Sequence, residues 1–124
     1  MSADVQRIRA EVVQAKAHFA QVGFADASCL LVQAALQTSV GKVYVAELEL
    51  ANYPSQMPKA FIRAPRLEIS PHKYKAGNIC YLHPNMWNPG RHNLSFVLAR
   101  VAKWLNKYDI YRATRRWVGA ELEH

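Results

Sequence analysis

The sequence predicts an α+β fold in a single domain spanning residues 1–124. An apolar stripe with helical period comes first, and runs rich in Val, Leu and Tyr follow it, separated by turn residues. A second apolar helical face lies near the C-terminus, after a long stretch with no clear period. This order predicts an N-terminal helix, an antiparallel meander of three to four strands, a long loop and C-terminal helices.

The first helix is expected to begin after Ser2, which can cap it, and to stop near Gly23. Apolar residues recur within it at alternating spacings of three and four, which places them on one face. They are Val5, Ile8, Val12, Ala15, Phe19 and Val22.

Two strands are expected at residues 29–36 and 42–50, with a turn at residues 39–41, and they form a β-hairpin. A third strand is expected at residues 60–63. The segment before it contains Pro54 and Pro58, which cannot donate to a strand ladder and so belong to a loop. The meander therefore follows directly from the pattern of apolar runs and turn residues.

Residues 64–92 show no clear period and contain four of the six prolines. A long irregular segment inside a compact domain is more often functional than accidental. After it, Asn93 can cap a second helix, and a shorter helical segment is expected over residues 110–117. The apolar face of the second helix contains Phe96, Val97, Val101, Trp104, Leu105 and Tyr108.

The composition indicates the cellular compartment of the protein and the state of its two cysteines. No run approaches the roughly 18–20 apolar residues that span a bilayer, and the N-terminus has no signal-peptide core, so a cytoplasmic protein without membrane contact is expected. A reducing compartment disfavours a lasting disulfide between Cys29 and Cys80. Cys29 is expected to be buried inside an apolar strand, which leaves Cys80 as the free thiol. No Cys/His spacing resembles a zinc site, and neither a metal nor a cofactor is expected.

The net charge of +7 fits three kinds of partner: an acidic protein, a nucleic acid or a membrane surface. The basic residues are scattered and form no recognisable nucleic-acid motif, so a nucleic-acid-binding domain is the weakest of these interpretations. We interpret the charge as a signal for docking of partner proteins. An ordinary solvated surface would account for it equally well.

Four short motifs lie in order around Cys80. A Tyr-Pro pair with another proline four residues on precedes it, a tripeptide ends eight residues before it, a glycine stands three before it, and a Trp-x-Pro follows. They are Tyr53-Pro54 with Pro58, Ser70-Pro71-His72, Gly77, and Trp87-Asn88-Pro89. Their arrangement resembles the ubiquitin-conjugating enzymes, whose cysteine carries a ubiquitin-like protein as a thioester. The resemblance covers about residues 5–108 and implies the UBC-like fold.

The resemblance makes Cys80 the catalytic nucleophile. The family's tripeptide ends in an asparagine thought to steady the oxyanion, and His72 occupies that position here. A histidine can donate from a ring nitrogen or act as a base near neutral pH, so His72 and His83 are candidate catalytic residues. His83-Pro84-Asn85 spells the family tripeptide but follows the cysteine, so we treat that match as coincidental. Structural support of the site is expected from Tyr53, Pro54, Gly77, Trp87 and Pro89.

The short loop after Cys80 and the short tail resemble bacterial members of the superfamily found in antiphage operons. Those proteins are encoded beside cGAS-like nucleotidyltransferases in CBASS systems, or beside ubiquitin-like proteins. The resemblance implies an activating enzyme that loads Cys80, with one of these two proteins as the carried substrate. An acceptor protein or a small amine would then receive it.

By analogy with the family, Arg7 and Arg9 on the first helix are candidates for docking the activating enzyme. The alternative is a UBC-like binding module without catalysis, for which the missing asparagine argues and the retained cysteine argues against. The last three residues, Leu122-Glu123-His124, have the appearance of the start of a purification tag, so His124 carries little weight.

Overall fold

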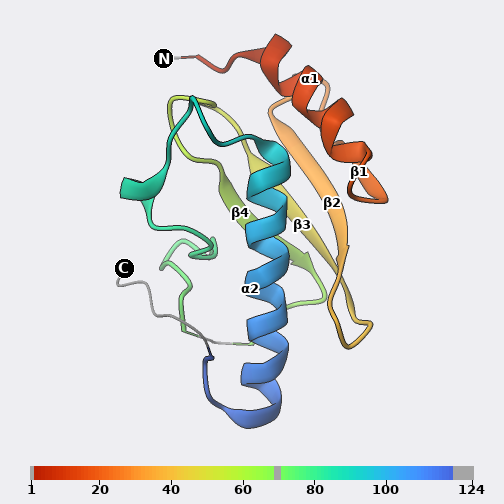
Figure 1. Ribbon diagram of the computed structural model, residues 1–124, viewed down its shortest axis with the longest axis vertical. Helices are drawn as coiled ribbons and strands as arrows, with labels where there is room; N and C mark the ends of the chain where they lie inside the picture. The colour runs from red at the N-terminus through yellow and green to blue at the C-terminus, as the bar shows by residue number, and fades with distance from the viewer. Residues whose placement is uncertain (1, 69–70, 119–124) are drawn as a thin grey trace.

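In the computed structural model, which describes residues 2–68 and 71–118, a helix is followed by a four-stranded sheet, a long loop and a second helix (Figure 1). Neighbouring strands all pair antiparallel in the order β1-β2-β3-β4, as in a meander. The α+β prediction and the element order are thereby confirmed. The elements are α1 (Val5–Lys16), β1 (Gln21–Phe24), β2 (Leu31–Gln37), β3 (Val43–Glu49), β4 (Lys59–Ala64), the 3₁₀ turn η1 (Pro84–Met86) and α2 (Leu94–Thr114).

The first helix is shorter than its apolar stripe predicted. Asp4, not Ser2, caps α1 by accepting a hydrogen bond from the backbone N–H of Arg7 at 3.1 Å, and the helix ends at Lys16. Val22 and Gly23 instead lie in β1, where Val22 pairs with Ala34 of β2. The prediction of a helix up to Gly23 was wrong. Val22 is buried as part of strand β1, and its position in the apolar spacing of the helix is a coincidence.

The predicted hairpin is confirmed as β2 and β3, and the predicted third strand as β4. Alternate residues of β2 and β3 point into the core, which gives each strand the period of two that a half-buried sheet requires. Cys29 is buried as expected, but it precedes β2 and has a positive φ of 64°. Its placement inside a strand was therefore wrong. Phe24 ends β1, and the chain turns back through Asp26, whose carboxylate accepts from the backbone N–H groups of Leu30 and Leu31.

The C-terminal helix is a single continuous element. Asn93 caps α2 as predicted, accepting from the backbone N–H of Phe96 at 2.8 Å. No Gly or Pro interrupts the sequence between Leu94 and Thr114, so the separate helix expected over residues 110–117 does not form. Arg115 takes a left-handed conformation with φ 61° and ends α2.

The core lies between one face of the sheet and the two helices. α2 crosses that face, and α1 packs beside the first turn of α2 and beside β1 (Figure 1). Neither helix in the described part of the chain is both long and apolar enough to cross a membrane. The largest side chains that are fully buried are Tyr44, Tyr53, Tyr108, Ile8, Leu48, Leu50, Ile79, Leu94, Leu98, Leu105, Val32 and Val97.

Candidate active site

Cys80 ends a small hairpin within the long loop. The backbone N–H of Tyr74 donates to the carbonyl of Asn78 at 2.8 Å, and that of Cys80 donates to the carbonyl of His72 at 2.8 Å. The N–H of Gly77 closes the turn on the carbonyl of Tyr74 at 2.9 Å. Gly77 has a φ of +98°, a conformation that residues with a Cβ adopt only under strain. The positive φ required at this turn therefore explains why a glycine stands three residues before the cysteine.

The hairpin is fixed to the sheet on one side and to α2 on the other. On the sheet side, the backbone N–H of Ile79 donates to the carbonyl of Ala60 in β4 at 2.9 Å. From α2, the Arg100 Nε donates to the carbonyl of Tyr81 at 3.0 Å, and the Trp104 Nε1 donates to the carbonyl of His72 at 3.2 Å. The position of the Cys80 backbone is thus set by regular elements although it belongs to a loop.

The Cys80 residue is only 6% exposed, and burial raises the pKa of its thiol above the ordinary value. A hydrogen bond with the Tyr74 side chain acts in the opposite direction and favours the thiolate. Burial and the same hydrogen bond raise the pKa of Tyr74 to about 12. Sequence reasoning missed Tyr74. The signal that could have found it is the Gly77 turn, which places Tyr74 across the hairpin from the residues leading to Cys80.

A groove of about 560 Å³ runs beside this hairpin. Tyr74 and Asn78 of the hairpin line this groove, and Tyr74 also interacts with Cys80, which is not itself among the lining residues. The volume lies in the range of ligand-binding clefts and is large enough for a short extended peptide. The lining residues are Ser55, Gln56, Met57, Pro58, Lys59, Tyr74, Asn78, Pro84, Trp87 and Pro89.

The two candidate histidines lie on either side of Cys80 along the chain, each in a defined setting. His72 has a positive φ of 60°, and its half-buried ring packs 5.0 Å from the ring of Trp117. His83 caps η1, with its Nδ1 accepting from the backbone N–H of Asn85 at 3.1 Å. The structure brings the His72 backbone to Cys80, and a chemical role for either imidazole stays a prediction. Ser70 and the tail residues 119–124 lie outside the described residues.

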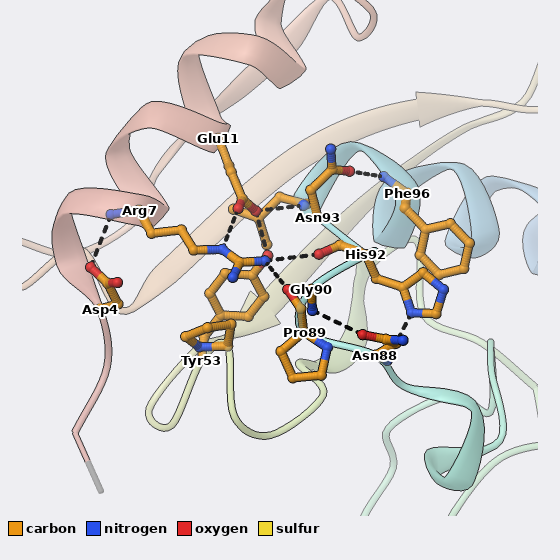
Figure 2. A network of polar contacts seen from close by, with 12 residues as sticks. Asp4, Arg7, Glu11, Tyr53, Asn88, Pro89, Gly90, His92, Asn93 and Phe96 are labelled. Carbon is orange, nitrogen blue, oxygen red and sulfur yellow. Dashed lines mark hydrogen bonds and ion pairs between the residues drawn. The ribbon is translucent and has the colours of Figure 1, made fainter.

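A polar network centred on Glu11 joins α1 to Tyr53, to the segment around Pro89 and to the start of α2 (Figure 2). The buried Glu11 carboxylate accepts from the Tyr53 hydroxyl, from the backbone N–H of Leu94 at 2.9 Å and from the Arg7 Nε at 2.5 Å. The Arg7 guanidinium also donates to the carbonyls of Pro89 at 2.7 Å and His92 at 2.9 Å. Burial and the bond to Glu11 raise the pKa of Tyr53.

Arg7 therefore joins α1 to the segment that leads into α2, a role that the sequence did not reveal. Its guanidinium also lies 5.4 Å from the centre of the Tyr53 ring. Arg9, two residues on, is exposed, and it is the better placed of the two predicted docking residues. Glu11 was not singled out from the sequence because a single acidic residue on a helix is ordinarily solvated.

Of the residues expected to support the site, Trp87 and Pro89 line the groove, and Tyr53 and Pro54 contact Trp87. Trp87 donates from Nε1 to the carbonyl of Pro54 at 2.8 Å, and its ring lies 5.9 Å from that of Tyr53. Pro89 accepts from Arg7 and lines the groove. Both cysteines are free, and no three His, Cys, Asp or Glu side chains within residues 2–68 and 71–118 gather as metal ligands.

The N-terminal helix, four-stranded meander, cysteine-bearing loop and crossing C-terminal helix define an E2-like protein with a UBC-like fold. The family model of the type II CBASS E2 protein matches residues 9–124, and the chain belongs to this family. A search of curated proteins found no match to the chain. Family membership indicates an E2-like role in CBASS antiphage systems.

Proposed function

We propose that the protein is a conjugating enzyme of bacterial antiphage defence, with Cys80 as its thioester-forming nucleophile. The observation that carries the proposal is a thiol on a fixed hairpin, other residues of which line a groove of peptide size, in a chain of the type II CBASS E2 family. A thioester carrier needs a fixed sulfur and room for the end of another chain beside it. The groove between Met57, Tyr74 and Trp87 offers that room.

The reaction has two steps. In loading, the Cys80 thiolate attacks the carbonyl carbon of a C-terminus held as a thioester by an activating enzyme. The new S–C bond forms and the old one breaks, and its electron pair leaves with the sulfur of the activating enzyme. In transfer, an amine attacks the same carbon, the bond to Cys80 breaks with its electron pair on the Cys80 sulfur, and the amine proton passes to water.

The carried protein is a cGAS-like nucleotidyltransferase or a ubiquitin-like protein, and the acceptor is a protein amine or a small amine. Support for this comes from the CBASS family, in which an E2-like protein acts within an antiphage system. A net charge of +7 favours docking of acidic partner surfaces. An activating enzyme completes the set because loading requires an already activated C-terminus.

Replacing Cys80 by alanine tests the role of the thiol. In cells that co-express the protein with its operon partners, the wild type is expected to form an adduct that non-reducing gels retain and reductant removes. Cys80→Ala is expected to abolish this adduct completely, because no other atom takes the place of its sulfur. Cys29→Ala is the matched control, since it removes the other free thiol, and it should leave the adduct intact. An adduct that survives in Cys80→Ala would contradict the proposal.

Arg9 is proposed to dock the activating enzyme. Arg9→Glu reverses a charge on the exposed side of α1, so loading of Cys80 is expected to slow by about tenfold, mostly through weaker association. The measurement is the initial rate of thioester formation with purified activating enzyme at two salt concentrations. Lys16→Glu, also exposed on α1, is the control and should have a smaller effect. Equal rates for Arg9→Glu and the wild type would remove Arg9 from the docking surface.

A binding module without catalysis is the second candidate function. The observation that favours it is the burial of Cys80, which raises its pKa and limits access to the sulfur. Such a module would bind the same partners with wild-type affinity after Cys80→Ala, and the wild type would form no reductant-sensitive adduct. Measuring partner affinity and adduct formation on the same two proteins therefore separates the two functions.

A further inference from the structure

The pairing of the Cys80 hairpin places Tyr74 next to the sulfur. Tyr74 pairs with Asn78, Lys73 with Ile79, and His72 with Cys80. Cross-strand partners share a face, and faces alternate along each strand, so Tyr74 and Cys80 are diagonal neighbours on the same face. Diagonal neighbours are separated by about 7–8 Å, a distance that an aromatic side chain spans. Ile79, on the opposite face, is bound to the sheet through its backbone N–H, which donates to the carbonyl of Ala60.

This register brings the Tyr74 hydroxyl within reach of the Cys80 thiol, and a hydrogen bond between the two side chains contributes to both of their pKa shifts. The Tyr74 pKa of about 12 means that the phenol keeps its proton at neutral pH and acts as the donor. The Cys80 sulfur is buried, and a buried sulfur resists taking a negative charge unless a donor faces it. Tyr74 provides such a donor at the sulfur itself.

We propose that Tyr74 is a catalytic residue that donates its hydroxyl hydrogen to the Cys80 sulfur and stabilises the thiolate. This rests on the proposed function, in which that thiolate is the nucleophile of loading and the leaving group of transfer. The Cys80 sulfur is negatively charged before it attacks in loading and after it leaves in transfer. In both cases the Tyr74 hydroxyl can donate a hydrogen bond to it while keeping its own proton. Tyr74 also borders the groove, so a chain end lying there would sit beside the same hydroxyl.

The test is the pH profile of Cys80 alkylation by iodoacetamide in a Cys29→Ala background, with and without Tyr74→Phe. Loss of one hydrogen bond to the thiolate is expected to raise the thiol pKa by about one unit. Thiolates become more nucleophilic as their pKa rises, with an exponent of about 0.4–0.5. Alkylation should therefore slow about threefold well below the pKa and quicken about threefold well above it, so that the two profiles cross.

A change in access to the sulfur would shift the rate by one factor at every pH, and the profiles would then not cross. Tyr111→Phe is the matched control, because it removes the same atom from a half-buried tyrosine on α2. It should leave the profile unchanged, and thermal melts check that each variant is folded. Superimposed or parallel profiles for Tyr74→Phe and its parent would overturn the proposal.

Alkylation needs no partner protein, so this result is independent of whether conjugation occurs. A shifted profile in Tyr74→Phe together with no adduct in the wild type would refute the proposed function and leave Tyr74 as the donor to the thiol. An adduct in the wild type together with an unshifted profile would refute only the role of Tyr74. In the enzyme as proposed, Tyr74→Phe should also slow loading at pH 7.5 about threefold.

Discussion

Replacement of Glu11 by alanine is expected to lower the free energy of unfolding by about 3 kcal/mol or more. The carboxylate is buried and accepts three hydrogen bonds that come from three separate segments of the chain. Its loss leaves the hydroxyl of the fully buried Tyr53 and the backbone N–H of Leu94 without their acceptor. It also removes a negative charge from the N-terminus of α2, where the helix dipole favours one.

Chemical denaturation followed by circular dichroism measures this effect. Gln14→Ala, at an exposed position on the same helix, is the control and should stay within about 0.5 kcal/mol of the wild type. Glu11→Gln keeps an oxygen acceptor and loses only the charge, so its free energy of unfolding should lie between those of Glu11→Ala and Gln14→Ala. If Glu11→Ala were as stable as Gln14→Ala, the network in Figure 2 would not contribute to the fold.

Replacement of Cys80 by serine is expected to change the chemistry of the adduct. A serine oxygen in the same place would form an oxygen ester in place of a thioester, because both side chains present one nucleophilic atom at the same position. The ester forms more slowly, since a hydroxyl is a weak nucleophile unless a base activates it. Once formed, it should survive reductant and be cleaved by mild alkali.

The measurement compares adducts of Cys80→Ser and the wild type, both in a Cys29→Ala background, after treatment with a thiol reductant or with alkali. The wild-type adduct should disappear in both treatments and the serine adduct only in alkali. The serine variant in this background has no cysteine, so an adduct that reductant still removes could not be a bond to this chain and would contradict the assignment of the adduct to residue 80. A serine adduct that resists both treatments would indicate an amide formed elsewhere on the chain.

Local patterns in the sequence predicted most of the fold. The period of two in β2 and β3 depends on neighbouring residues, and Asn93 caps α2 through a contact three residues away. The end of α1 was mispredicted because the apolar spacing continues to Val22 across a change from helix to strand. Long-range pairing of β1 with β2 decided that boundary, and spacing along the chain does not report such pairing.

The site shows the same division. The motifs around Cys80 include Trp87 and Pro89, which line the groove beside the hairpin that holds the thiol. They did not predict Tyr74 at the sulfur, since that contact depends on how the hairpin folds. Nor did they predict that Arg7 would turn inward, because its partners Pro89 and His92 lie more than eighty residues away in the sequence.

The Arg7 contacts also connect two surfaces that different molecules would occupy. Arg7 lies on α1, two residues before Arg9, and it donates to Pro89, which forms part of the groove wall. In the proposed function, this contact joins the docking face of α1 to the groove wall, so binding at one surface would alter the binding free energy at the other. Thermodynamic reciprocity would make these two changes in binding free energy equal, so docking at α1 and seating of a chain end in the groove would be coupled through one guanidinium.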